Sequence, residues 1–172
     1  MKGHPGGDAH TRRMIALAGL PRGARILDLG AGDGSAVRLL RELGCRAEGL
    51  DLAPRSPLVK RGGFLRTGLP DASYDALLSQ CAFYQSGDVP GALRESARLL
   101  RPGGLLLLSD VFVAPPEPLL AEAGFQLLRG EDMSEAWKTY FIDAIWRGAF
   151  DHCPPPRGRG KVRYWLLIAR KR

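Results

Sequence analysis

The chain has 172 residues, enough for one domain with a single hydrophobic core. Hydrophobic residues make up 45% of it and charged residues 25%, a composition that is ordinary for a soluble globular protein. The run of four leucines at residues 105–108 is of strand length, and no apolar stretch follows Lys2. We therefore expect neither a membrane span nor a secretory signal, and a cytoplasmic location.

The net charge of +7 raises the possibility of nucleic-acid binding. Most of the arginines are spread singly along the chain, however, and only the tail from Arg157 to Arg172 concentrates them; no basic patch of the kind that stacks bases on interleaved aromatic residues is evident. This pattern favours a solvated basic surface. The three cysteines, Cys45, Cys81 and Cys153, lack paired spacing, and His152–Cys153 is the one adjacent pair of soft ligands, so we expect separate reduced thiols and no metal site.

In the first two thirds of the chain, short apolar runs alternate with segments of helical spacing. Pro54 and Pro57 leave at most a poor helix at 54–60, and the sequence Arg101–Gly104 signals a turn. Strands alternating with helices predict crossover connections and a parallel sheet. The predicted strands are 26–29, 47–52, 63–65, 74–79 and 105–109, and the predicted helices are 34–43 and 89–100.

The last third begins with a break at Pro115 and Pro116. It is expected to contain a short helix at 119–123, a strand at 125–128, a helix at 134–147, a loop at 153–160 and a final strand at 162–169. Ser134 is the expected N-cap of the long helix and Gly148 its C-cap. Trp137, Phe141 and Ile145 are candidates for the core, a lid or a dimer surface, and we favour the core. We expect one domain over residues 1–172, with a lid or helix at 1–23 and an inserted helix and loop at 131–160.

Gly30, Gly32 and Gly34 lie between the first strand and the helix that follows it. Backbone without Cβ atoms can approach a ligand closely, and the helix N-terminus adds free N–H groups. Dinucleotide-binding loops carry a G-x-G-x-x-G pattern, whereas the third glycine here comes one residue early. Asp28, just before the loop, would repel a pyrophosphate but suits a ligand with an ammonium and a sulfonium, which favours S-adenosylmethionine over NAD.

Asp51 ends the second strand, about twenty residues after the glycine loop. A carboxylate at this place can accept hydrogen bonds from both hydroxyls of a ribose. Since NAD and S-adenosylmethionine both contain a ribose, Asp51 supports a nucleoside ligand without choosing between them.

Four segments in order resemble the motifs of class I methyltransferases: ILDLGAGDG, EGLD, LPDASYDALLSQCAFY and ESARLLRPGGLLLLSD. The resemblance runs from about Ala24 to Asp110, with a looser match at LLAEAGF, and is nearest to the small-molecule branch that includes ubiquinone and menaquinone methyltransferases. HPGGDAHTRR, AIWRG and YWLLIARKR are similar to a narrower group of short bacterial members. The resemblance implies a Rossmann-like α/β fold: a seven-stranded, mostly parallel sheet with an antiparallel last strand and helices on both faces.

The resemblance also implies roles for individual residues. Asp28 and the loop residues Gly30, Ala31 and Gly32 would hold the methionine moiety, and Asp51 the ribose. Leu52 would pack beside the adenine, while Ser79 and Gln80 would face the sulfonium and the amino group. Relatives usually carry an acidic residue near the end of the third strand that reads the adenine; residues 64–69 lack one, so this role would pass to backbone groups or Thr67.

A second departure is the short segment after the fifth strand, where relatives have an insertion that covers the substrate. Residues 4–11 and the helix at 134–147 are candidates to cover the site instead. Methyl transfer is an in-line displacement that needs a general base only when the acceptor atom carries a proton. His10, Tyr84 and His152 are candidates, but the sequence assigns no catalytic residue.

We therefore expect a methyltransferase that uses S-adenosylmethionine and acts on a small-molecule acceptor. Two alternatives stay open. The positive charge suggests a nucleic-acid methyltransferase, although the stretch SQCAF replaces the Asn/Asp-Pro-Pro-Tyr/Phe segment typical of amino-methylating enzymes. The short segment after the fifth strand and the altered third strand are also compatible with a cofactor-binding module without catalysis. The sequence leaves the acceptor and the oligomeric state open.

Overall fold

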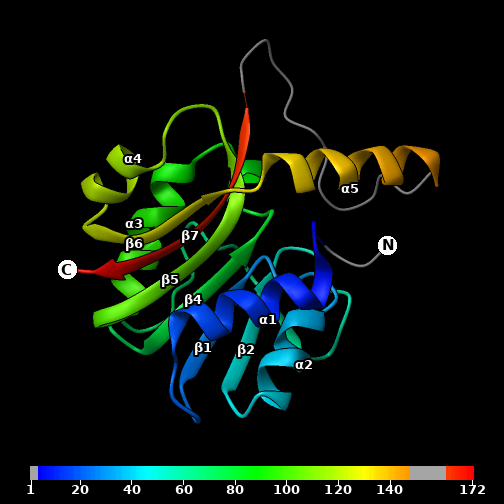
Figure 1. Cartoon of the computed structure of the whole chain (residues 1–172). Coiled ribbons are helices and arrows are strands. Elements are labelled where there is room, and N and C mark those ends of the chain that lie inside the picture. The colour runs from blue at the N-terminus through cyan, green and yellow to red at the C-terminus, as the bar shows by residue number, and fades with distance from the viewer. Residues whose placement is uncertain (1–3, 148–161) are drawn as a thin grey trace.

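A computed structural model describes residues 4–147 and 162–172. Its frame is a seven-stranded sheet in the order β3-β2-β1-β4-β5-β7-β6 (Figure 1). Strand β7 runs antiparallel to both of its neighbours, β5 and β6, and the pairs among β1 to β5 are parallel, as expected from the sequence. The strands are β1 Arg25–Leu29, β2 Arg46–Asp51, β3 Val59–Arg61, β4 Tyr74–Gln80, β5 Leu100–Phe112, β6 Phe125–Asp132 and β7 Arg163–Lys171.

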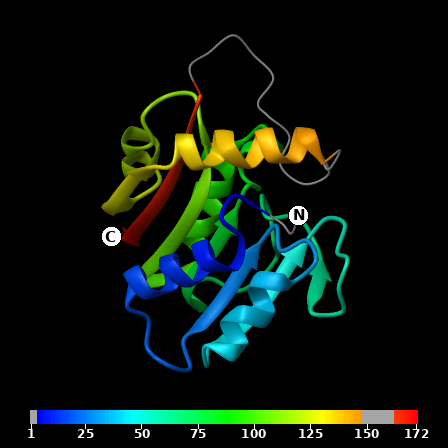
Figure 2. The ribbon, with the colours of Figure 1, turned by 45° about the vertical axis from the view of Figure 1, so that its right-hand side comes forward.

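Helices cover both faces of the sheet (Figures 1 and 2). Ile26 of β1 packs in a cluster with Met14 of the first helix and Val37 of the second, whereas its neighbour Leu27 packs with Leu93 on the opposite face. Alternate residues of a buried strand point to opposite faces, which is why β1 is apolar on both sides. The helices are α1 Gly7–Ala18, α2 Ser35–Glu42, α3 Val89–Leu99, α4 Glu117–Glu122 and α5 Ser134–Trp146, with a 3-10 turn η1 at Tyr84–Ser86.

The third strand is where the structure first corrects the sequence prediction. Strand β3 is Val59–Arg61, not 63–65, and no helix forms at 54–60. Val59 pairs with Gly49 of β2, and its side chain lies 3.1 Å from where a Cβ on Gly49 would be. Burial of Val59 against this glycine places the strand before Gly62 and Gly63, and the local sequence pattern could not predict this long-range contact.

Strand β5 contains the segment predicted as a turn. Leu100 pairs with Tyr74 and Leu105 with Ala76, so the four residues between them face a single residue of β4. Gly103 adopts a φ of +75° within this segment. The Pro-Gly-Gly signal therefore marks a bulge inside one long strand and not the connection before a shorter one.

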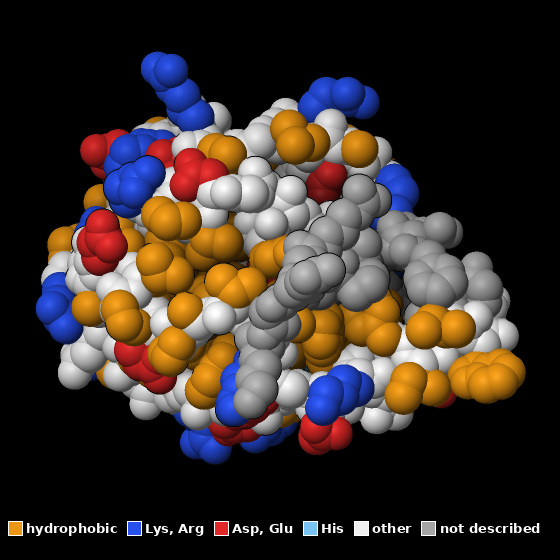
Figure 3. Space-filling view, turned by 90° about the horizontal axis from the view of Figure 1, so that it is seen from above, with side chains coloured by type: hydrophobic (Ala, Val, Ile, Leu, Met, Phe, Trp, Pro, Cys, Tyr) orange, Lys and Arg blue, Asp and Glu red, His pale blue; other side chains and the backbone are white. Residues whose placement is uncertain are grey.

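Helix α5 is only partly packed on the sheet. Trp137 is buried and stacks on Tyr164 of β7, with ring centroids 6.3 Å apart and nearly parallel planes. Ile145 is 56% exposed and Trp146 is 84% exposed, so the prediction of a core position was wrong for Ile145. The helix extends past the edge of the sheet, and its far end presents hydrophobic side chains to the outside (Figures 1 and 3).

The start of α5 also differs slightly from the prediction. Met133 is the N-cap, and Ser134, predicted to be the cap, is the first helical residue. Its backbone N–H donates to Asp132 Oδ1 at 2.9 Å, so an aspartate supplies the capping oxygen. Gly148, His152, Cys153 and the loop predicted at 153–160 lie outside the described residues. Within the described part of the chain, the helices are too short or too polar to cross a bilayer.

Candidate active site

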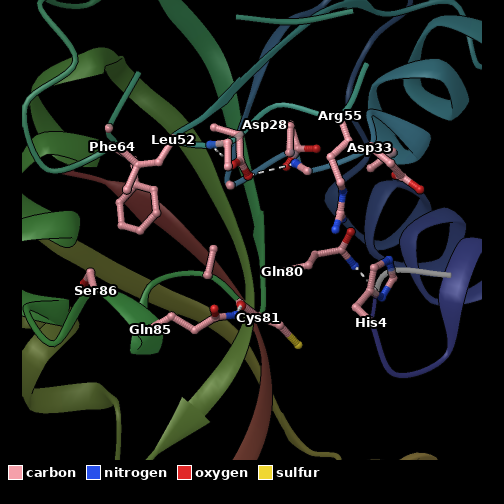
Figure 4. A pocket seen from close by; sticks show the side chains of 18 of the residues that line it. His4, Asp28, Asp33, Leu52, Arg55, Phe64, Gln80, Cys81, Gln85 and Ser86 are labelled. Atoms are coloured by element: carbon pink, nitrogen blue, oxygen red, sulfur yellow. Dashed lines mark hydrogen bonds between the residues drawn. The ribbon is translucent and has the colours of Figure 1, made fainter. Parts of the chain in front are cut away.

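A cavity of about 760 Å³ opens at the carboxyl ends of β1, β2 and β4 (Figure 4). This is the edge of an open α/β sheet at which ligands bind, and the volume suits a molecule of cofactor size. Its walls are the end of β1 with the loop after it, the end of β2 with residues 52, 53 and 55, the segment 63–66, and the end of β4 with residues 81, 82, 85 and 86, to which the N-terminal segment adds His4.

The glycine loop is shaped by the strands on either side of it. Gly30 has a φ of +83°, and a Cβ at this position would lie 2.3 Å from the Cβ of Ala82. The backbone N–H groups of Gly30 and Ala31 both donate to Leu50 O, at 2.8 and 3.1 Å. Glycine is required at position 30 because the loop passes directly over the end of β4 while it is tied to β2.

Asp51 is held at the cavity wall by two backbone hydrogen bonds. Its Oδ2 accepts from Gly32 N at 2.9 Å, and its Oδ1 accepts from Ala53 N at 2.8 Å. Each carboxylate oxygen has a further lone pair, so the fixed group can still accept hydrogen bonds from a ligand. Leu52, predicted beside the adenine, is 69% exposed and also lines the cavity.

Asp28 lies in the cavity wall and is only 4% exposed. Among the described residues, no hydrogen bond reaches its carboxylate. Burial, together with the charges of Asp51 and Asp33, raises its pKa to about 7. A buried carboxylate surrounded by like charges is costly to ionise, and a cation placed beside it would relieve that cost.

The end of β4 contributes Gln80 to the cavity, as the resemblance implied. Its Oε1 accepts from Thr11 Oγ1 at 3.1 Å, and its Nε2 lies 3.4 Å from Nδ1 of His4 (Figure 4). Residues of the N-terminal segment therefore close this side of the cavity. The next residue, Cys81, also lines the cavity and has a φ of +55°, which is unusual for a residue other than glycine.

Two of the predicted site residues are not in the cavity wall. Ser79 is fully buried and donates from Oγ to Leu29 O at 2.9 Å, which ties β4 to β1. Thr67 donates from both its N–H and its hydroxyl to Glu95 Oε1, at 2.8 and 2.6 Å. The structure thus brings together Asp28, Gly30, Ala31, Gly32, Asp51, Leu52 and Gln80, and leaves Ser79 and Thr67 behind the wall.

The candidate bases are also placed away from the cavity wall. His10 is buried and lies 3.1 Å from Ser109 Oγ through Nε2, and burial lowers its pKa to about 4. The backbone N–H of Tyr84 donates to the buried Asp110. The prediction for His152 falls outside the described residues. Among the described residues, no group of three or more His, Cys, Asp and Glu side chains is arranged to hold a metal ion.

Sequence reasoning missed several residues of the wall. Phe64 forms an aromatic pair with Phe83, with ring centroids 5.2 Å apart, and so stabilises the segment after β3. Arg55 could have been predicted as a wall residue, because it lies four residues after Asp51 and the end of β2 was already predicted to reach the ligand. The wall residues that were not predicted as ligands are His4, Asp33, Ser35, Ala36, Ala53, Arg55, Gly63, Phe64, Leu65, Arg66, Cys81, Ala82, Gln85 and Ser86.

Comparison with known proteins decides the family. Residues 8–159 match the family described as a methyltransferase domain. The chain belongs to the methyltransferase-domain family. Demethylmenaquinone methyltransferase from Tropheryma whipplei (strain Twist) is 32% identical over 126 residues, which cover 63% of this chain and 53% of that protein. The methyltransferase domain thus spans about half the length of this relative.

Solved structures agree with this assignment. The methyltransferase domain superimposes with a TM-score of 0.74 and 26% identity on a structure described as a putative sarcosine dimethylglycine methyltransferase from Galdieria sulphuraria, over 95% of this chain and 84% of that one. Phosphoethanolamine N-methyltransferase 2 of Haemonchus contortus, solved in complex with S-adenosyl-L-methionine, has a TM-score of 0.78 at 16% identity, over 98% of this chain and 53% of that one. The second likeness shows the fold alone. The Rossmann-like class I architecture predicted from the motifs is confirmed.

Proposed function

We propose that this chain is an S-adenosylmethionine-dependent methyltransferase that acts on a small-molecule acceptor. The observation that carries the proposal is the pair of carboxylates flanking the glycine loop in one cavity. Asp28 is buried without a hydrogen-bond partner among the described residues, whereas Asp51 is fixed by backbone N–H groups with lone pairs to spare. The first suits a cationic ligand and the second a ribose.

The wall residues fit the parts of S-adenosylmethionine. Asp28 would face its positively charged groups, with Gly30 and Gly32 giving the methionine moiety close access to the backbone. Asp51 would accept from the ribose hydroxyls. Leu52 and Phe64 are the apolar wall residues nearest to where an adenine would follow the ribose (Figure 4). Since Thr67 already donates to Glu95, we assign the adenine to this wall and not to Thr67.

S-adenosylmethionine, when bound, supplies a methyl group on a sulfonium sulfur. Displacement at that carbon has a neutral leaving group, so the protein mainly aligns the acceptor and excludes water. The N-terminal segment contributes to both tasks, because His4 and Thr11 close the cavity against Gln80. We assign no general base.

The acceptor should lie beyond the end of β4, on the side of the cavity away from the carboxylates. The described wall there consists of Gln80, Cys81, Ala82, Gln85 and Ser86. The aspartate and arginine residues of the wall belong to the other half, formed by the ends of β1 and β2 and by segment 63–66, and among them Arg55 extends its side chain toward Gln80 (Figure 4). The uncharged side chains beyond Gln80 support an acceptor without a formal charge near its reacting atom. The names of the reported relatives also refer to small molecules.

Calorimetric titration with S-adenosylmethionine and S-adenosylhomocysteine tests the cofactor. We expect both to bind, and Asp51→Ala to weaken both about 10-fold or more because hydrogen bonds to a charged group are lost. Asp143→Asn, on the exposed part of α5, is the matched control and should bind like the wild type. Absence of binding to the wild type would refute the proposal.

Transfer of labelled methyl to a panel of metabolites tests the acceptor. Labelling of a small molecule supports the proposal. Cofactor binding without labelling of any acceptor in a broad panel would favour a binding module without catalysis. Labelling of RNA or DNA that persists at physiological salt would favour the nucleic-acid alternative instead.

A further inference from the structure

Two arginines line the cavity, and they lie in different parts of its wall. Arg66 belongs to the segment after β3, next to the apolar wall formed by Phe64 and Leu65. Arg55 belongs to the loop after β2 and lies over the glycine loop (Figure 4). Each of the two arginines carries a permanent positive charge, and its position determines which part of a bound ligand it can contact.

The position of Arg55 is fixed by its own backbone. Its N–H donates to Gly32 O at 3.0 Å, which anchors the residue to the glycine loop. Its Nη2 lies 3.1 Å from where a Cβ on Gly32 would be, and Gly32 has a φ of +51°. The side chain therefore crosses the space that the missing Cβ leaves open, and extends from the side of Asp33 toward Gln80 and His4 (Figure 4).

Charges of both signs line the cavity around the glycine loop. Asp28 is a buried carboxylate, and Arg55 is an exposed residue that carries a guanidinium. The charge of Arg55 contributes to lowering the pKa of Asp33, whereas Asp33 raises the pKa of Asp28. The amino-acid end of S-adenosylmethionine is a zwitterion, and a site that holds it must offer one group of each sign.

We propose that Arg55 binds the α-carboxylate of the methionine moiety, so that the site selects its cofactor by the amino-acid end as well as by the nucleoside. This inference rests on the proposed function. A guanidinium can donate two parallel hydrogen bonds to a carboxylate, which a lysine cannot. Arg66 cannot serve in this role, because it follows Phe64 and Leu65 and precedes Thr67, which is tied to Glu95 behind the wall.

Decarboxylated S-adenosylmethionine, which lacks only the carboxylate, is the probe. Dissociation constants for it and for S-adenosylmethionine are measured by calorimetry with the wild type, Arg55→Met, Arg55→Lys and the matched control Arg66→Met. We expect the wild type to bind S-adenosylmethionine about 10-fold more tightly than the decarboxylated form, the low end for a charge-assisted hydrogen bond at an exposed group. Arg55→Met should abolish this preference by weakening only the carboxylated ligand, and Arg55→Lys should restore part of it.

Arg66→Met should keep the wild-type preference even if it weakens both ligands. Loss of the preference in Arg66→Met and not in Arg55→Met would overturn the inference, as would equal binding of the two ligands by the wild type. Equal binding leaves the proposed function standing, whereas failure of the wild type to bind either ligand refutes the function and the inference together. Thermal melting of each variant checks folding, and an exposed arginine should leave the melting temperature unchanged.

Discussion

Asp28→Asn should stabilise the ligand-free protein while it removes cofactor binding. The carboxylate is 4% exposed, and its pKa is raised from 3.8 to about 7. In the unfolded chain the same group ionises near its ordinary pKa. Stability should therefore fall as the pH rises from about 4 to about 7, because over that range the unfolded state releases its proton first. Above pH 7 the penalty is complete.

The size of the penalty follows from the pKa values. At about 1.36 kcal/mol per pH unit, a rise from 3.8 to about 7 corresponds to about 4 kcal/mol for the ionised group. Asparagine keeps the shape but must bury an amide at the same place, which costs about 1–3 kcal/mol without a partner. We therefore expect a net gain of about 2 kcal/mol at pH 8, or about 4–8 °C in melting temperature.

Denaturant unfolding and thermal melting at several pH values are the assays. The advantage of Asp28→Asn should shrink between pH 7 and pH 4, and S-adenosylmethionine should raise the melting temperature of the wild type but not of this variant. Asp33→Asn, in the same loop, is the control and should show no gain, since the pKa of Asp33 is lowered. A variant less stable than the wild type at pH 8, or a difference independent of pH, would refute the reasoning.

Two further outcomes follow from local structure. Gly30→Ala should cost more than about 3 kcal/mol of unfolding free energy, since its Cβ would lie 2.3 Å from that of Ala82; Gly68→Ala, at a φ of +69° with open space around it, should cost only about 1 kcal/mol. Glu95→Gln should cost about 2 kcal/mol at pH 7, because the pKa of Glu95 is lowered to about 2, chiefly by Arg98; the difference should fade as the pH drops from about 4.5 to 2. Equal losses for the two alanine variants, or a pH-independent effect of Glu95→Gln, would contradict these expectations.

Much of the fold was predictable, because strands buried on both faces leave apolar runs that local reasoning can read. Strands β1, β2 and β4 and helices α2 and α3 lie within a residue or two of their predicted bounds. The errors fall where pairing with a distant strand decides the outcome. Val59 becomes a strand residue by pairing with Gly49, and the segment from Arg101 to Gly104 stays in β5 because of its pairing with β4.

The sequence by itself determined the glycine loop and its two carboxylates, since each lies at a fixed distance along the chain from a strand end. Gly30, Asp28 and Asp51 are therefore found where the motif predicted. Only the tertiary structure decided which other side chains reach the cavity. It selects His4 from the segment 4–11, which was expected only to cover the site, and leaves Thr67 behind the wall, because Glu95, 28 residues away, accepts both of its hydrogen bonds. Such contacts depend on how distant segments of the chain pack together, and the spacing of residues along the sequence does not predict them.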